Sequence, residues 1–551
     1  MCALVEVHVR RSARGVVQVA CGVALMLAAC GTDEPTGGRA DAITVRGCKP
    51  ENPLVPSMTM ESCGGQVVDQ LFSKLVRYDP DTAEPEYEIA ESIESTDNQT
   101  WTVTLEDGWT FHNGDPITAQ SFVDAWNWAA YAPNGSPNSH FFRRIEGYQD
   151  LQPEGENGSG ERAITPDMVA STEMSGLRIV DELTFTVTLS QPEASFPKRV
   201  GYAAFAPLPD EFYEDPERFG ENPIGSGPFE FVEWIRNSEI KLRRYDGYQG
   251  DTEPQIDEVT FRIYQDEGAA YSDLQADNLD LVPQLPTSAL ADDAYRDDLG
   301  ERYVEKEALA VSTISFPPES VDDSYADPRL RQAISMAIDR ETITESIFHG
   351  SREPATGWVA PGVAGYEPGV CGDNCTYDPE RARELFDEAG GYDGTMTLSY
   401  NSDGDNKPWV DAVCNSIKNT LGVDCVGVPV ADFSTFRSQI NNREMTGMFR
   451  NLWQADYPSI ESFLAEVYVT GASGNDTGYS NPEFDELIKD AASLPEEQAM
   501  AAYHEAESLL VDDMPSVPLW YTTTIAGYST KVDNVKITPF QTIDLLSVVI
   551  K

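Results

Sequence analysis

Basic residues are scarce in this chain of 551 residues. It contains 38 Lys and Arg against 93 Asp and Glu, so its formal net charge is −55. Nucleic acids and anionic membrane surfaces attract proteins through Lys and Arg, and this balance therefore argues against both as partners. The acidity is compatible with high solubility, with a saline habitat or with attraction of cationic solutes, and the sequence leaves these explanations open.

The chain also lacks the motifs by which common enzymes are recognised. It has no G-x-S-x-G elbow, no H-E-x-x-H pair and no Walker loop. Beyond the first thirty residues the histidines stand singly, at His112, His140, His349 and His504. A lone His is more simply a surface or core residue than a metal ligand. The oxygen-rich segment Asn401–Asn406 has its Gly misplaced for an EF-hand loop and no closing Glu, so we interpret it as a turn. We predict no catalytic residue, no metal site and no cofactor.

Long apolar runs are also rare, and the clearest one lies near the start of the chain. Residues 16–29 are largely apolar but too few to cross a membrane, and Arg10, Arg11 and Arg14 precede them. Followed by Cys30, this arrangement resembles a bacterial lipoprotein signal. The resemblance implies that residues 1–29 are removed and that Cys30 becomes the lipidated first residue. Residues 30–47 are predicted to be a flexible, lipid-anchored tether.

Cysteines are few, and their number is informative once the signal and the lipidated residue are set aside. Six then remain: Cys48, Cys63, Cys371, Cys375, Cys414 and Cys425. An even number outside the cytoplasm favours disulfides, with fifteen possible pairings. Pairing of neighbours is the simplest arrangement. A zinc site is disfavoured because the spacings are not of the C-x2-C type.

The second half of the chain shows a regular alternation of strands and helices. The apolar pattern predicts, in order, strand Thr395–Tyr400, helix Pro408–Leu421, strand Val423–Val430, helix Asp432–Asn442 and strand Met448–Trp453. This order is typical of an α/β fold with a largely parallel sheet. Asp456 would follow the carboxyl end of the last strand, where open α/β sheets bind ligands. The alternative is that Asp456 only caps a turn.

Several segments, in conserved order along the chain, resemble one known family. The most distinctive is STDNQTWTVTLEDGWTFHNGDPITAQSFVDAWNWA, residues 95–129, and further matches occur at residues 222–231, 274–281, 327–340, 378–390, 479–487 and 514–520. They resemble the family 5 extracellular solute-binding proteins, which are the oligopeptide- and dipeptide-binding receptors of ABC importers. One departure is Lys74, which stands in FSKL where the family usually has Gly.

The resemblance implies an α/β, two-lobed fold like that of periplasmic binding proteins, with a hinge and an additional inserted α+β domain. The expected domains are a signal peptide at 1–29, a tether at 30–47, lobe I from 48–84, 193–265 and 522–551, inserted domain II at 85–192, and lobe III at 266–521. The chain would cross the hinge near residues 263–265 and 520–522.

The resemblance also implies a ligand site. In peptide-binding members, the Asp of a W-x-x-D-Y-like motif pairs with the α-ammonium of an extended peptide, and residues Trp453, Asp456 and Tyr457 match that motif. A buried ammonium needs an opposite charge close by. Arg450 lies where some members place a basic residue near the ligand carboxylate. A structural salt bridge is the alternative role for Arg450.

These expectations together describe a monomeric receptor without enzymatic activity. It would be anchored by its lipid to the outer face of the cell membrane, and would deliver peptides to an ABC permease and its ATPase subunits. Other solutes bound by relatives, namely a nickel chelate, a sugar or a glutathione-like peptide, remain alternatives within the fold. A secreted hydrolase, or a surface sensor or chaperone without a transporter, are alternatives from other classes.

Overall fold

The computed structural model describes residues 41–153, 164–494 and 496–551. The predicted signal peptide, the lipidation site Cys30 and the first part of the predicted tether lie outside the described residues. In the described part of the chain, no helix has both the length and the apolar character needed to cross a membrane.

The last part of the predicted tether is a strand, so that prediction is wrong for these residues. Ala42–Gly47 forms β1, which pairs in parallel with β10 (Glu258–Ile263) along its whole length. Ile43 and Val45 alternate with polar residues and are both 2 % exposed. Because this alternation buries one face of the strand, β1 belongs to the folded part of the protein.

An eleven-stranded mixed sheet runs through the described chain. Its order is β15 (Cys425–Val430), β14 (Met396–Asn401), β16 (Met448–Gln454), β12 (Tyr303–Ser315), β17 (Ser516–Tyr528), β11 (Leu281–Val282), β1, β10, β9 (Glu239–Arg244) and β8 (Phe229–Ile235), with β13 (Arg352–Pro354) paired to β17. The strands β14, β15 and β16 pair in parallel, as predicted, whereas β12 is antiparallel to both β16 and β17. Strands β8, β9, β11 and β13 also form antiparallel pairs, so the prediction of a largely parallel sheet is wrong for the sheet as a whole.

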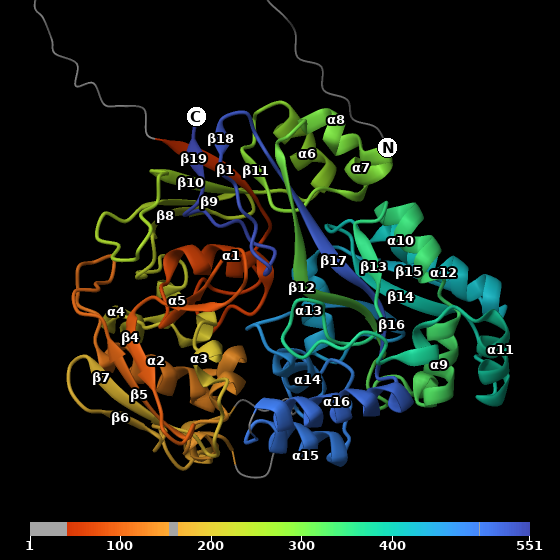
Figure 1. Cartoon of the computed structure of the whole chain (residues 1–551), viewed down its shortest axis with the longest axis horizontal. Helices are drawn as coiled ribbons and strands as arrows, with labels where there is room; N and C mark the ends of the chain where they lie inside the picture. Colours follow the sequence, from red (N-terminus) through yellow and green to blue (C-terminus); the bar gives the residue numbers. More distant parts are fainter. Residues whose placement is uncertain (1–40, 154–163, 495) are drawn as a thin grey trace, which may run out of the picture. The chain divides into compact units, whose positions relative to one another are not determined.

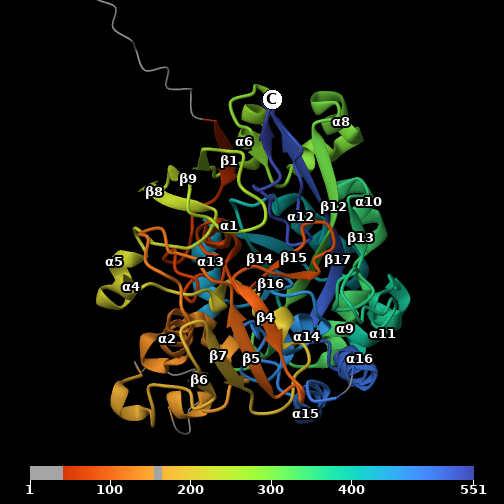
Figure 2. The ribbon, with the colours of Figure 1, turned by 60° about the vertical axis from the view of Figure 1, so that its left-hand side comes forward.

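A smaller antiparallel sheet lies within residues 90–188. It contains β4 (Ala90–Glu94), β5 (Thr100–Leu105), β7 (Thr184–Thr188) and β6 (Leu177–Ile179), and α2 (Ala119–Ala130) buries Phe122 and Trp126. The remaining short strands are β2 (Val76–Tyr78), β3 (Pro85–Tyr87), β18 (Val532–Asp533) and β19 (Val549–Ile550). Figure 2 brings the smaller sheet to the front.

The other α-helices come from all parts of the described chain. They are α1 (Ser62–Leu71), α3 (Phe196–Arg199), α4 (Asp210–Glu214), α5 (Pro216–Phe219), α6 (Glu267–Gln275), α7 (Thr287–Leu290), α8 (Ala294–Leu299), α9 (Pro328–Met336), α10 (Arg340–Phe348), α11 (Pro379–Glu388), α12 (Lys407–Leu421), α13 (Phe433–Asn441), α14 (Ile460–Tyr468), α15 (Pro482–Ala491) and α16 (Glu496–Asp513). Sequence signals explain several starts: Asp327 and Asp378 cap α9 and α11, each with Pro as the first helical residue.

Two large hydrophobic clusters divide these elements. The first is formed mainly by β1–β10 and α1–α5, together with residues 532–548, and we call these elements the first lobe. The second is formed mainly by α9–α12 and α14–α16 with β14 and parts of β12, β16 and β17; we call these helices, α13 and β13–β16 the second lobe. Figure 1 shows β12 and β17 running between the two lobes.

The GSGP motif of residues 225–228 connects α1 to the start of β8. The backbone nitrogens of Ser226 and Gly227 both donate to the carbonyl oxygen of Leu71, at 2.8 Å. A Cβ atom on Gly225 would lie 1.8 Å from that same oxygen. Glycine at position 225 is therefore required by this close approach to the end of α1.

Three disulfides join neighbouring cysteines, which confirms the simplest pairing. They are Cys48–Cys63, Cys371–Cys375 and Cys414–Cys425. The last one connects α12 to β15, so it fixes one helix against the edge strand of the sheet.

Candidate functional site

A cavity of about 630 Å³ lies between the two lobes and is lined by residues from both. From the first lobe it receives side chains such as Tyr78 and Tyr202, and from the second lobe Arg450, Trp453 and Asp456. This volume is in the range of ordinary ligand sites.

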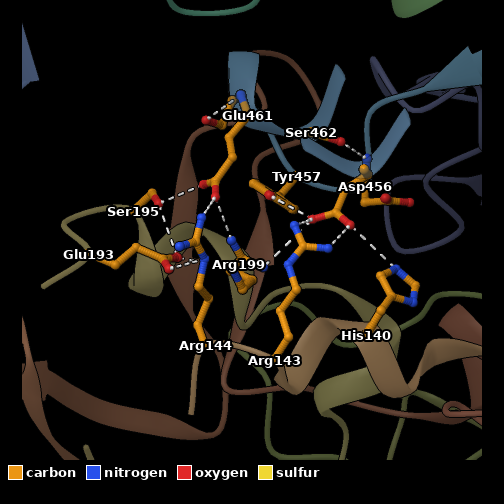
Figure 3. A network of polar contacts seen from close by, with 12 residues as sticks. His140, Arg143, Arg144, Glu193, Ser195, Arg199, Asp456, Tyr457, Glu461 and Ser462 are labelled. Carbon is orange, nitrogen blue, oxygen red and sulfur yellow. Dashed lines mark hydrogen bonds and ion pairs between the residues drawn. The ribbon is translucent and has the colours of Figure 1, made fainter. Parts of the chain in front are cut away.

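Asp456 comes two residues after β16, at the carboxyl end of the strand, as predicted. Its backbone nitrogen donates to Ser462 Oγ of α14 at 2.9 Å (Figure 3). Its carboxylate lines the cavity, and within the described residues it makes neither a hydrogen bond nor an ion pair. Burial raises the pKa of the Asp456 carboxyl well above its ordinary value, Glu466 adds to the rise, and Arg199 opposes it.

The Asp456 charge also affects the pKa of two tyrosines of the first lobe. Burial raises the pKa of the Tyr78 and Tyr202 hydroxyls, and the Asp456 carboxylate raises both further. Tyr78 donates to the carbonyl oxygen of Lys198 at 2.6 Å. The Tyr202 ring stacks on Phe141 with 4.1 Å between centroids. Tyr78, Phe141 and Tyr202 line the same cavity as the Asp456 carboxyl and contribute apolar surface to it.

Of the other two motif residues, Trp453 lines the cavity and Tyr457 does not. Trp453 lines the cavity, and Gly474 packs so closely that a Cβ there would lie 2.6 Å from the indole ring. Tyr457 is 0 % exposed, is not among the residues that line the cavity, and packs into the hydrophobic cluster of the first lobe. Its ring lies 5.1 Å from the guanidinium carbon of Arg199.

Beside Asp456 lies a group of buried charges that sequence reasoning missed. We call it the charge cluster: Arg143, Arg144, Glu193, Arg199, Glu461 and Glu466. Figure 3 shows labelled members of this cluster pointing toward one another beside Tyr457, with Asp456 on the other side of Tyr457. One signal was present in the sequence. Helix α14, IESFLAEVY, is apolar around most of its circumference, and two Glu in such a helix require partners when it is buried.

His140 adjoins this cluster and also lines the cavity. Its Nε2 lies 3.5 Å from Glu466 Oε2, and its Nδ1 lies 3.1 Å from the carbonyl oxygen of Pro137. Burial lowers the pKa of His140 to about 4, although Glu466 opposes the shift. His140 is therefore neutral at pH 7, consistent with its interpretation as a core residue.

Arg450 lines the cavity at another point along β16. Its guanidinium donates to Asn401 Oδ1 from Nε, at 2.8 Å, and also from Nη2. It lies over the rings of Phe433 and Phe436, at 5.3 and 5.1 Å. Burial lowers the pKa of Arg450 to about 10, and repulsion by Arg437 contributes. Among the described residues no carboxylate lies within ion-pair distance of Arg450, so the alternative of a structural salt bridge is wrong.

Lys74, the departure from the family pattern, also lines the cavity. Its Nζ lies 3.0 Å from Asp69 Oδ1, so its charge is paired. Burial alone would lower the pKa of Lys74, but Asp69 and Glu88 outweigh burial and raise it. Lys74 thus adds a paired cation to the lining of the cavity.

The oxygen-rich segment 401–406 is occupied by contacts within the protein. Asp403 Oδ2 accepts from the backbone nitrogen of Phe433 at 3.1 Å, and Asp405 Oδ2 accepts from that of Thr287 at 2.7 Å. In the part of the chain that the structure describes, no group of three or more His, Cys, Asp or Glu could hold a metal ion.

Comparison with known proteins decides the family. Residues 84–475 match the model of the bacterial extracellular solute-binding proteins, family 5. The chain belongs to this family. Its family 5 relatives include oligopeptide-binding protein OppA of Bacillus subtilis, 26 % identical over 492 residues that cover 85 % of each chain. They also include the periplasmic murein peptide-binding protein MppA of Escherichia coli, 27 % identical over 474 residues that cover 83 % of each.

Solved structures of family 5 proteins share the fold. Escherichia coli MppA superposes with a TM-score of 0.83 at 23 % identity, covering 93 % of this chain and 99 % of that one. Haemophilus influenzae OppA in complex with the peptide RPPGFSPFR gives 0.79 at 22 % identity, with the same coverage. The two-lobed α/β fold expected from the sequence is confirmed. The family consists of solute-binding proteins.

Proposed function

We propose that this protein is the substrate-binding receptor of an ABC importer, and that it captures a short peptide in the cavity between its lobes. The observation that carries the proposal is the unpaired carboxylate of Asp456. The names of the relatives, which bind oligopeptides, dipeptides and murein peptides, support the same ligand class.

The charge balance around Asp456 favours a cationic ligand group. The charge cluster contains three Arg and three Glu, so it is neutral by itself. When ionised, Asp456 adds one negative charge with no ion-pair partner among the described residues. A buried, unpaired charge is strongly unfavourable, and the α-ammonium of a peptide would neutralise it.

Arg450 offers the complementary charge for the other end of the ligand. Arg450 and Asp456 are six residues apart along β16 and the turn after it, which corresponds to roughly 20 Å between their Cα atoms at ~3.3 Å per residue. An extended peptide could run beside this segment, with its carboxylate toward Arg450 and its main chain hydrogen-bonded to protein backbone. Trp453 would contact the ligand between the two ends. Tyr457, which does not line the cavity, would hold the Asp456 loop in place and would not contact the ligand.

The wider assignments belong to the same proposal. The first lobe would comprise lobe I, residues 41–84, 193–265 and 522–551, together with inserted domain II, residues 85–192. The second lobe would belong to lobe III, residues 266–521, with hinge crossings near 263–265 and 520–522. The protein would act as a monomer outside the cytoplasm, anchored through a lipid on Cys30 to the outer face of the cell membrane. Its partners would be an ABC permease and the associated ATPase subunits.

Native mass spectrometry of freshly purified protein tests the ligand class. We expect bound species with masses of short peptides, released by mild denaturation and sequenced by fragmentation. A homogeneous metal chelate, haem or sugar in their place would overturn the assignment. Protein stripped of ligand and then incubated with a defined mixture of two- to six-residue peptides should regain peptide adducts without producing cleavage products.

A further inference from the structure

The charge cluster joins the two lobes. Arg143 and Arg199 come from the first lobe, whereas Glu461 and Glu466 lie on α14 of the second lobe. Arg143 donates to the two Glu466 oxygens at 3.1 and 3.2 Å, and Arg199 Nη2 donates to Glu461 Oε1 at 2.9 Å. Side chains of Arg199, Glu461 and Glu466 are at most 1 % exposed.

The two glutamates obtain their counter-ions only across this interface. In the described part of the chain, every cation within ion-pair distance of Glu461 or Glu466 belongs to the first lobe. Burial alone would raise the pKa of both carboxyls, but the arginines lower it below the ordinary value. If the lobes separate, water must replace the arginines. The ion pairs therefore exist only when the lobes are in contact.

None of the six residues of the charge cluster lines the cavity. They therefore act on a ligand indirectly, through the contact between the lobes and through the charges of Glu466 and Arg199 acting on Asp456. The cluster does touch the loop that carries Asp456: Arg199 lies over the Tyr457 ring, and Tyr457 Oη lies 3.5 Å from Glu466 Oε1. Lobe contact thus holds the residue next to Asp456 in place.

We propose that the charge cluster is a latch: it stabilises the closed arrangement of the lobes and so sets how tightly any peptide is retained. Arg143 and Arg199 are positioning residues in this view. The inference rests on the proposed capture of a ligand between the lobes. It adds that a set of ion pairs outside the binding cavity determines the fraction of molecules in the closed, binding-competent state.

The first test is Glu466→Gln, measured by calorimetry with a peptide identified on the purified protein and with its N-acetylated form. Breaking a buried ion pair should weaken binding of both peptides, including the acetylated peptide that lacks the ammonium proposed to pair with Asp456, by a factor on the order of 100. The melting temperature without ligand should stay within about 2 °C, because an open molecule does not use the latch. Unchanged affinity, or a lower melting temperature with unchanged affinity, would overturn the proposal.

A matched control and a milder variant accompany this test. Glu221→Gln makes the same substitution in the exposed Arg236–Glu221 pair of the first lobe, 3.1 Å apart, and should leave both affinities unchanged. Tyr457→Phe keeps the ring and removes only the hydroxyl that lies 3.5 Å from Glu466. It should weaken binding of both peptides about threefold, as expected for the loss of one hydrogen bond. If Glu466→Gln does not fold, an unchanged affinity of Tyr457→Phe would overturn the latch.

A second measurement needs no ligand. Gln191 Nε2 donates to the carbonyl oxygen of Lys489 at 3.0 Å across the same interface, so cysteines at both positions would meet when the lobes close. The rate at which a short bismaleimide joins Gln191→Cys to Lys489→Cys should fall at least ~10-fold when Glu466→Gln is added. An equal rate would overturn the latch. A wild-type protein that binds no peptide would overturn the proposed function. The cross-linking rate would still test whether the charge cluster stabilises the closed arrangement of the lobes.

Discussion

At the scale of single residues, Asp456 carries most of the functional proposal. Asp456→Asn retains the side-chain shape but removes the charge that would neutralise a buried ammonium. Truncating one partner of such a pair costs about 2–5 kcal/mol, or roughly 30- to 4000-fold in Kd. Calorimetry with free and N-acetylated forms of one peptide should show this loss for the free form.

The comparison between the two peptides separates a ligand contact from a stabilising role. Acetylation should weaken binding to the native protein by a similar amount, and in Asp456→Asn the two peptides should bind almost equally. If Asp456 only braced its own loop, the variant would melt at a lower temperature and would keep the full acetylation penalty. A coupling energy within ~0.5 kcal/mol of zero would contradict the assignment.

The raised pKa of Asp456 predicts how binding changes with pH. The ligand ammonium needs the ionised carboxylate, so affinity should rise as pH increases through the raised pKa and fall above about 8, where the α-amino group loses its proton. The groups that act on this carboxyl are Glu466 and Arg199, with the Tyr78 and Tyr202 hydroxyls nearby. Calorimetry in buffers of different ionisation enthalpy should show proton release on binding below the raised pKa.

The stability of the ligand-free protein should change with pH in the direction opposite to the affinity. Because the folded pKa of Asp456 lies above its unfolded value, this group stabilises the ligand-free protein when protonated, and that contribution disappears as pH rises through the raised pKa. In Asp456→Asn, neither the rise in affinity nor the loss of stability should occur as pH increases through this range. A variant with the same pH profile as the native protein would show that another group titrates.

At the scale of elements, β1 shows how a short segment joins a distant part of the chain. Ile43 is buried at 2 % exposure and is paired with Val259, 216 residues further on. Ile43→Ala should lower the free energy of unfolding by about 2–5 kcal/mol through lost burial and the cavity left behind. Urea denaturation should give this loss. As a control, Asp41→Ala, at the exposed residue before the strand, should change the urea midpoint little. A urea midpoint of Ile43→Ala equal to that of the native protein would contradict the role of β1.

At the scale of the whole molecule, the proposed anchor can be separated from the fold. Cys30→Ser should release the protein from membranes in detergent-free washing, while its peptide-binding curve stays unchanged, because the anchor precedes the folded residues. Fractionation of cells followed by immunoblotting measures the first effect and calorimetry the second. A variant that remains with the membrane would contradict the lipoprotein assignment.

Features that depend on residues close together in the chain can be predicted from the sequence. The strand pattern of residues 395–453 and the Asp and Pro residues that start α9 and α11 are local, so periodicity and spacing predict them. Pairing of neighbouring cysteines was the simplest of fifteen arrangements that the sequence left open. The position of Asp456 after the end of β16 follows from the same strand pattern. The family motifs extended this to the two-lobed fold.

The contacts of each side chain, by contrast, depend on how distant parts of the chain pack together. The tertiary structure paired β1 with β10, turned Tyr457 away from the cavity, gave Arg450 an amide partner in place of a carboxylate, and joined Arg143 to Glu466 across 323 positions of the chain. Local patterns report which face of an element is buried. They do not report which distant element covers that face, and the pairing of buried charges depends on that second fact.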